Sequence, residues 1–139
     1  MLYEESYGTI ALKKENDIWY TYLIKNKSGN HWGFPKGRAN QLETKKQAAF
    51  RELKEETNLE FSKFLFEKPL IEQYIFLRET KETLKRVYYY LIEVKGEANI
   101  SSDEISEGKW IEISMAKEQI TFKASKEIAN LVEIILKNL

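Results

Sequence analysis

The stretch Gly37–Leu59 reads GRANQLETKKQAAFRELKEETNL. Its second half, Thr44–Thr57, is rich in helix-forming residues and contains no glycine or proline. Phe50 and Leu53 stand one helical turn apart, which indicates one buried stripe. Asn58 follows, and asparagine is the second choice after glycine for a left-handed residue that ends a helix. The stretch therefore predicts a structured loop at its start and a helix over 44–57.

Three glutamates of this helix, Glu52, Glu55 and Glu56, have the spacing i, i+3 and i+4 and so share one helix face. Such carboxylates repel one another by a few tenths of a kcal/mol for each exposed pair. Oxygen ligands of this kind suit hard divalent cations such as Mg²⁺. A solvated acidic face is the alternative, because lysines stand nearby in the sequence.

The spacing of the whole stretch narrows these alternatives. It can be written Gly37-x5-Glu43-x7-Arg51-Glu52-Leu53-x-Glu55-Glu56-x-Asn58-Leu59. This resembles the Nudix box, G-x5-E-x7-R-E-U-x-E-E-x-G-U, where U is aliphatic. Asn58 is the one departure, and asparagine tolerates the left-handed conformation that glycine would adopt there. The resemblance implies the Nudix fold, of α/β (α+β) class, with a mixed β-sheet sandwiched between helices.

The resemblance also implies a metal centre. The carboxylates of Glu52, Glu55 and Glu56, with the carbonyl of Gly37, are expected to hold Mg²⁺ or Mn²⁺. Glu52 and Glu55 are expected to be catalytic. The cation would neutralise phosphate oxygens and activate a water for attack on phosphorus.

Three further residues are implied by the same resemblance. Arg51 is expected to pair with Glu43 or with a helix glutamate in a supporting role. Glu104 precedes Trp110 by six residues, as in a similar segment of the family's tetraphosphate hydrolases. The matching glutamate there faces the metals as a further ligand or as the general base. Glu107 is the alternative, and either could be an ordinary surface residue.

The segment His31–Gly37, HWGFPKG, resembles the lead-in to the box of bis(5′-nucleosyl) tetraphosphate hydrolases. RNA 5′-pyrophosphohydrolases have a similar Trp-x-Phe-Pro run, so the segment separates these subfamilies only weakly. Lys36 and His31 are expected to bind substrate, with Lys36 on phosphate. Core packing is the favoured interpretation of the two aromatic residues Trp32 and Phe34.

Two aromatic residues are candidates for holding the nucleobase. Tyr89 lies in Lys85–Leu91, which resembles the family strand that carries a base-stacking tyrosine. Phe122, before the last helix, matches an aromatic residue that contacts adenine in the same subfamily. Lys85 is a further substrate-binding candidate. Cross-strand packing is the alternative reading of the tyrosines.

The rest of the chain predicts two helices and six or seven strands. Apolar residues at Ile128, Leu131, Ile134 and Ile135 predict an amphipathic helix over 124–136. Residues 78–86 read as a charged connection. The expected strands are 7–13, 18–24, 61–66, 70–77, 87–94 and 109–113, the first two joined as a hairpin.

Composition limits the class of protein. The 139 residues suit one domain over 1–139, and 42% of them are hydrophobic. The 22 basic and 22 acidic residues leave no net charge, so no stable nucleic-acid partner is expected. Cysteine is absent, which excludes disulfides and thiolate chemistry. With neither a secretory signal nor a membrane-spanning run, the sequence predicts a cytoplasmic protein.

The leading functional hypothesis is a Mg²⁺- or Mn²⁺-dependent hydrolase that cleaves diadenosine tetraphosphate asymmetrically to ATP and AMP. Its expected partner is a nucleotide, most of all a dinucleoside polyphosphate. The alternatives within the family are an RNA 5′-pyrophosphohydrolase and a (d)NTP pyrophosphohydrolase. A non-catalytic nucleotide-sensing module is the alternative of another class. The sequence specifies no protein partner.

Overall fold

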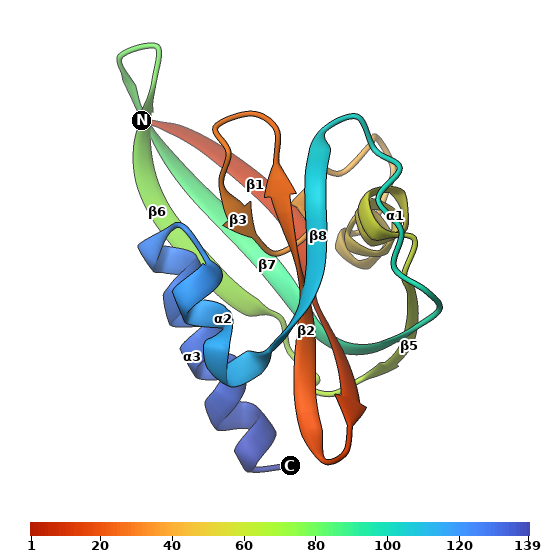
Figure 1. The fold of residues 1–139 in the computed structure, drawn as a ribbon. Coiled ribbons are helices and arrows are strands. Elements are labelled where there is room, and N and C mark those ends of the chain that lie inside the picture. The colour runs from red at the N-terminus through yellow and green to blue at the C-terminus, as the bar shows by residue number, and fades with distance from the viewer.

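A computed structural model describes residues 1–139 and places three helices around one eight-stranded mixed sheet (Figure 1). In chain order the elements are β1 (Leu2–Glu15), β2 (Ile18–Asn26), β3 (Trp32–Gly33), β4 (Lys36–Gly37), α1 (Lys45–Thr57), β5 (Glu60–Phe64), β6 (Leu70–Arg78), β7 (Lys81–Lys95), β8 (Ile105–Glu112), α2 (Ile113–Gln119) and α3 (Lys123–Lys137).

The centre of the sheet is a long parallel pair, β1 and β7, aligned from Leu2 opposite Thr83 to Leu12 opposite Glu93. Every other pairing is antiparallel. The strand order is β3-β2-β1-β7-β5, with β4 also pairing β1, β6 pairing β7 and β8 pairing β2. Two parallel strands require a long connection between them. In this chain the connection from β1 to β7 contains α1 and the strands β2 to β6.

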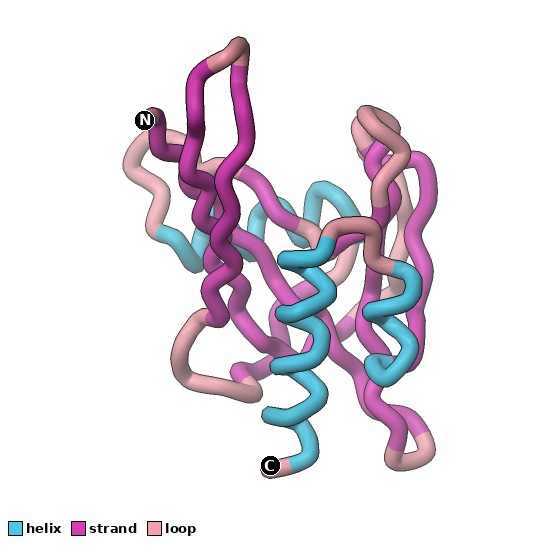
Figure 2. Tube along the Cα trace, turned by 90° about the vertical axis from the view of Figure 1, so that its left-hand side faces the viewer, coloured by secondary structure: helices cyan, strands magenta, loops and turns pink.

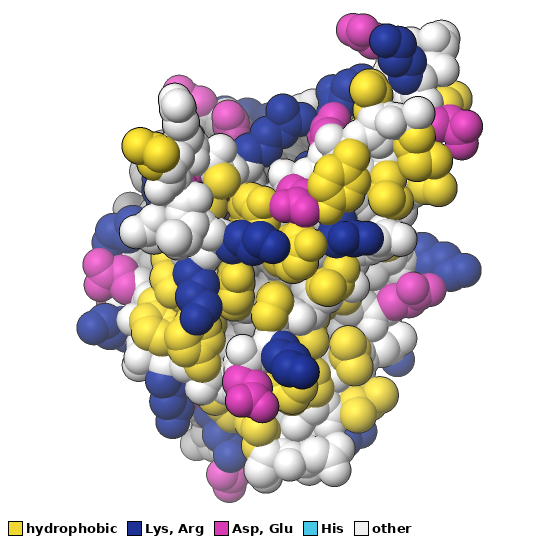
Figure 3. Space-filling view, turned by 180° about the vertical axis from the view of Figure 1, so that it is seen from behind, with side chains coloured by type: hydrophobic (Ala, Val, Ile, Leu, Met, Phe, Trp, Pro, Cys, Tyr) yellow, Lys and Arg dark blue, Asp and Glu magenta, His cyan; other side chains and the backbone are white.

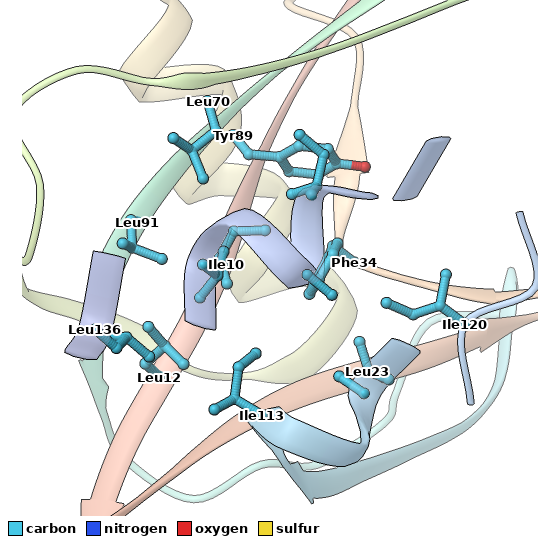
Figure 4. Close-up of a cluster of buried hydrophobic side chains, with 14 of the residues drawn as sticks. Ile10, Leu12, Leu23, Phe34, Leu70, Tyr89, Leu91, Ile113, Ile120 and Leu136 are labelled. Atoms are coloured by element: carbon cyan, nitrogen blue, oxygen red, sulfur yellow. The ribbon is translucent and has the colours of Figure 1, made fainter. Parts of the chain in front are cut away.

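The two faces of the sheet are covered by different helices. On one face, α2 and α3 close a cluster of 15 buried residues, of which Figure 4 shows Ile10 and Leu23 beside Ile113 and Ile120. On the other face, α1 contributes Leu53 to a second cluster of 10 buried residues. The predicted class, a mixed sheet sandwiched between helices, is therefore confirmed.

Helix α1 begins and ends as its sequence predicts. The Thr44 hydroxyl accepts from the Gln47 amide at 3.1 Å, and the Gln47 side-chain oxygen accepts from the Thr44 amide at 2.8 Å. These reciprocal bonds form a capping box. At the other end Asn58 is left-handed, with φ 68°, and its N–H donates to the Lys54 carbonyl. Asparagine thus replaces the family's glycine without breaking the turn.

The predicted connection over 78–86 is wrong. Strands β6 and β7 form one hairpin whose turn is Glu79–Thr80, both with positive φ. The hairpin extends beyond the rest of the fold (Figure 2), and charged side chains are tolerated there because water solvates them. On its outer face Ile75 and Leu77 are more than half exposed, and Figure 3 shows hydrophobic side chains along the projecting hairpin.

The end of the chain differs from prediction in two places. The expected strand 109–113 is the end of β8, and the short helix α2 follows with only Ile113 and Ala116 buried. In α3 the expected core residues Leu131 and Ile134 are 40% and 59% exposed. The small Ala129 lies in the buried stripe instead, alongside larger apolar residues. None of the three helices is both long and apolar enough to cross a membrane.

Candidate metal and nucleotide site

Gly37 brings the backbone of β4 against the carboxylate helix. It pairs with Tyr7 of β1, which fixes its position at the sheet. A Cβ atom at Gly37 would lie 2.1 Å from Cδ of Glu52. Only glycine therefore lets the Glu52 carboxylate occupy this place, beside the carbonyl that the sequence predicts as a metal ligand.

Arg51 organises the carboxylates. Its Nε donates to Glu43 at 2.7 Å, and its Nη1 donates to Glu52 at 2.9 Å. The same Nη1 lies 3.2 Å from both oxygens of Glu55. Its Nη2 donates to the Arg38 carbonyl at 2.8 Å, which ties the preceding loop to the helix. The guanidinium hydrogen bonds lower the pKa of Glu43.

Glu56 lies outside this network. It is 5% exposed, and its Oε1 is buried without a hydrogen-bond partner. Burial raises the pKa of Glu56 to about 8, and the charges of Glu52 and Glu104 contribute to the rise. A buried carboxylate with an unpartnered oxygen is destabilising unless a cation or a proton compensates its charge.

Glu104 lies on the same side as these carboxylates. Its carbonyl accepts from the Lys27 amide at 2.9 Å, which fixes the segment that precedes β8. Burial raises the pKa of Glu52 as well, and the Glu104 charge adds to that rise. Glu107, the alternative candidate, instead pairs with Lys25 at 3.4 Å.

The residues fit a hard divalent cation, although no three carboxylate or histidine side chains converge on one point. Arg51 accounts for this, because it holds Glu52 and Glu55 in its own hydrogen bonds. The donors are all oxygen atoms, as Mg²⁺ and Mn²⁺ prefer. The orphaned oxygen of Glu56 and the close approach at Gly37 are the two features that a bound cation would explain.

A cavity of about 570 Å³ opens beside this centre. Its lining combines aromatic rings with four basic side chains and one carboxylate, a composition suited to a nucleotide. The lining residues are Glu4, Lys36, Tyr74, Phe76, Arg78, Lys85, Phe122, Lys123 and Ala124. Lys36 joins the cavity to the metal centre, since it precedes Gly37 and its pKa responds to the charge of Glu56.

The structure brings together four of the five predicted substrate residues. Lys36, Lys85 and Phe122 line the cavity. The His31 ring lies 4.9 Å from the Phe122 ring and so stands beside it. Burial lowers the pKa of His31, and Lys36 lowers it further.

Tyr89 is the prediction that the structure contradicts. Its side chain is 1% exposed and belongs to the core beneath α2 and α3. Its ring packs edge-on against Phe34, with centroids 5.5 Å apart, as Figure 4 shows. A base cannot stack on a ring that is enclosed in this way, so the packing alternative is the correct one.

Sequence reasoning missed the aromatic wall of the cavity. Tyr74, Phe76 and Arg78 alternate along β6 and line the cavity together. A period of two was visible in the sequence and places these side chains on one face. The sequence gives no comparable signal for Glu4 or Lys123.

Comparison with known proteins gives a family match over most of the chain. The model for the NUDIX domain matches residues 4–131. Two curated proteins match a shorter segment, 40% of this chain in each case. They are the m7GpppN-mRNA hydrolase dcap-2 of Caenorhabditis elegans, 42% identical over 59 residues, and the chloroplastic Nudix hydrolase 27 of Arabidopsis thaliana, 44% identical over 55 residues. The matched segment spans only 7% and 24% of their respective lengths.

Solved structures share the fold at low identity. A binary complex of the Ap4A hydrolase of C. elegans superposes with a TM-score of 0.74 at 19% identity, covering 97% of this chain and 98% of that one. The NUDIX domain of Shewanella oneidensis NrtR, complexed with ADP ribose, gives 0.77 at 13% identity, covering 98% and 90%. At these identities the likeness establishes the fold alone.

The glycine at 37 provides a direct test of the metal centre. We expect Gly37→Ala to displace the Glu52 side chain and to weaken Mn²⁺ binding at least about tenfold, the loss expected for one displaced charged ligand. Isothermal titration calorimetry with Mn²⁺ measures this change.

Gly33→Ala is the matched control, because a Cβ atom there meets nothing within 4 Å. It should leave both Mn²⁺ affinity and melting temperature close to those of the parent. Equal Mn²⁺ affinity in the two variants would remove Gly37 and Glu52 from the metal centre.

Proposed function

The chain belongs to the NUDIX family, and on that premise we propose that it hydrolyses diadenosine tetraphosphate asymmetrically to ATP and AMP. The family acts on pyrophosphate-containing, nucleotide-related substrates, and its hydrolases generally use divalent metal ions. The observation that carries the finer proposal is the cavity, whose aromatic and basic lining meets the carboxylate centre at Lys36. This combination suits a nucleoside attached to a chain of phosphates.

In the proposed mechanism, Glu52, Glu55, Glu56 and the Gly37 carbonyl would hold Mg²⁺ or Mn²⁺. When bound, the cation supplies charge neutralisation at phosphate oxygens and activation of water. A carboxylate takes the proton from the attacking water, and either Glu104 or a glutamate of α1 can serve. Arg51 keeps Glu52 and Glu55 in place through its hydrogen bonds.

Lys36 is proposed to stabilise the departing phosphate. Burial lowers the pKa of its ammonium, while the carboxylates of Glu72 and Glu56 oppose that shift. Lys36 therefore lines the cavity and is also close enough to Glu72 and Glu56 for their carboxylates to favour its charged form. A cation fixed in advance beside developing negative charge lowers the barrier without reorganisation at the moment of reaction.

The nucleoside is proposed to bind between Tyr74 and Phe122. Phe122 is 55% exposed and stands at the cavity beside His31. Tyr74 takes the role that the sequence assigned to Tyr89, because it lines the cavity and Tyr89 does not. Stacking on an aromatic ring contributes about 1–3 kcal/mol for each base.

Other activities of the NUDIX family are the alternatives that the experiment must distinguish. The two curated relatives include an mRNA cap hydrolase, and RNA 5′-pyrophosphohydrolases share the lead-in of the box. The absence of net charge favours a small nucleotide over a long RNA. A non-catalytic sensor would have no need of the full set of glutamates. We also propose that residues 1–139 form a single domain and that the protein is cytoplasmic.

The activity is tested with a substrate panel in Mg²⁺: diadenosine tetraphosphate, nucleoside triphosphates, ADP-ribose, and capped and triphosphorylated RNA. We expect the dinucleotide to be cleaved with the highest kcat/KM, and chromatography to show ATP and AMP in equal amounts. Release of ADP alone, or preferred turnover of another substrate, would overturn the proposal.

The base site is tested by Tyr74→Ala and Phe122→Ala. Each should lower kcat/KM for the dinucleotide by about tenfold, the lower part of the range expected for one lost stacking contact. Phe66→Ala is the control, because Phe66 is similarly part-exposed and lies outside the cavity. A control variant as impaired as the other two would show that the loss comes from general destabilisation.

A further inference from the structure

Three cations contact the carboxylate of Glu4, which lines the cavity. Arg78 and Lys85 line the cavity as well, whereas Arg38 reaches its edge through its contact with Glu4. Arg38 Nη2 donates to the carboxylate at 2.8 Å, and Arg78 donates from Nε at 2.6 Å and from Nη2 at 3.2 Å. The Lys85 ammonium lies 3.6 Å from the same carboxylate. Burial alone would raise the pKa of Glu4, but these cations hold it below its usual value.

The fold brings these residues together from four separate segments. Glu4 is opposite Lys85 in the parallel pair of β1 and β7, and Lys85 is opposite Tyr74 in the hairpin. Arg78 ends β6, and its guanidinium lies 5.3 Å from the Phe76 ring. Arg38 follows Gly37, and its carbonyl is the group that accepts from Arg51. The cluster therefore adjoins both the cavity and the metal centre.

The charges in this cluster do not balance. Three cations surround one carboxylate, and the other partner of Lys85 is the neutral hydroxyl of Ser6 at 2.6 Å. Lys36 and Lys123 add to the positive charge around the cavity, and the carboxylates of Glu72 and Glu56 offset part of the charge at Lys36. In a chain with no net charge, this local excess favours an anion.

The two arginines are also accessible. The Glu4 side chain is only 15% exposed, whereas those of Arg38 and Arg78 are 66% and 50% exposed. A guanidinium has five N–H donors, so neither arginine is saturated by Glu4. A purely structural role, in which the Arg78–Glu4 pair attaches the hairpin to β1, would need only that one ion pair. Surface ion pairs contribute little stability, and this role does not account for the two other cations, Arg38 and Lys85.

We propose that Arg38 and Arg78, held in position by Glu4, form an anion subsite for a substrate phosphate beyond the one that contacts Lys36. The site then selects nucleotides with three or more linked phosphates over those with two. The selectivity rests on the proposed function, since that function places the base and the cleaved bond. The anion binding stands on the cluster alone and can be measured without turnover.

Binding of inorganic tripolyphosphate to the metal-free protein tests the subsite by calorimetry. Arg38→Gln and Arg78→Gln should each raise Kd about tenfold, as expected for one lost charge-assisted contact. Arg78→Lys should recover part of the affinity, because it keeps the charge and loses the fork of donors.

Arg86→Gln is the matched control, because the Arg86 guanidinium bonds to Gln73, does not line the cavity and is not among the cations that pair with Glu4. Its Kd should equal that of the parent, and all variants should keep the parent's melting temperature within a few degrees. Unchanged Kd values in Arg38→Gln and Arg78→Gln would overturn the subsite. An equal loss in Arg86→Gln would also overturn it, because binding would then follow net charge.

Turnover tests the selectivity separately. Arg78→Gln should lower kcat/KM for diadenosine tetraphosphate about tenfold and lower that for ADP-ribose by a clearly smaller factor. An equal loss on both substrates would overturn the selectivity. If the parent cleaves neither substrate while tripolyphosphate binding still depends on the arginines, the proposed function fails and the anion subsite stands.

Discussion

The hydrogen bonds of the Arg51 guanidinium are the interaction on which the rest of the site depends. One planar group reaches Glu43 in the loop, Glu52 and Glu55 on α1, and the backbone carbonyl of Arg38. It offsets the repulsion between carboxylates on one helix face. It also fixes the loop against the helix, so that Gly37, Lys36 and the side chain of Arg38 reach their places.

The Arg51 hydrogen bonds do not extend to the carboxylate of Glu56. Arg51 bonds to Glu52 and Glu55, whereas Glu56 is buried with an unpartnered oxygen and a pKa of about 8. Glu104 adds further negative charge from the segment before β8. A divalent cation would compensate this charge, and it would bring together carboxylates that otherwise do not converge on one point.

Local rules were enough to predict the helix, and long-range packing decided the nucleotide site. The capping residues of α1 and the spacing from Gly37 to Glu56 depend on neighbours along the chain, so the sequence specified them. Tyr89 and Tyr74 lie on the same face of the sheet, because Leu70 is opposite Tyr89 and Tyr74 is opposite Lys85. They differ in their position along that face, since Tyr89 lies in the core with α2 and α3 whereas Tyr74 lines the cavity, and no local pattern reveals this difference. The contact of Arg38 with Glu4 joins residues 34 apart in the sequence, and the pairing of β1 with β4 brings them together.

If Glu56, whose buried Oε1 has no hydrogen-bond partner, is a metal ligand, a bound ion must lie next to its carboxylate. Anomalous diffraction from crystals soaked in Mn²⁺ tests it most directly, because the anomalous peak locates the ion independently of the protein atoms. We expect a peak within about 2.0–2.3 Å of a Glu56 oxygen, with Glu52 turned towards the same ion. Absence of a peak at Glu56, or Mn²⁺ bound only at the exposed Glu55, would contradict it.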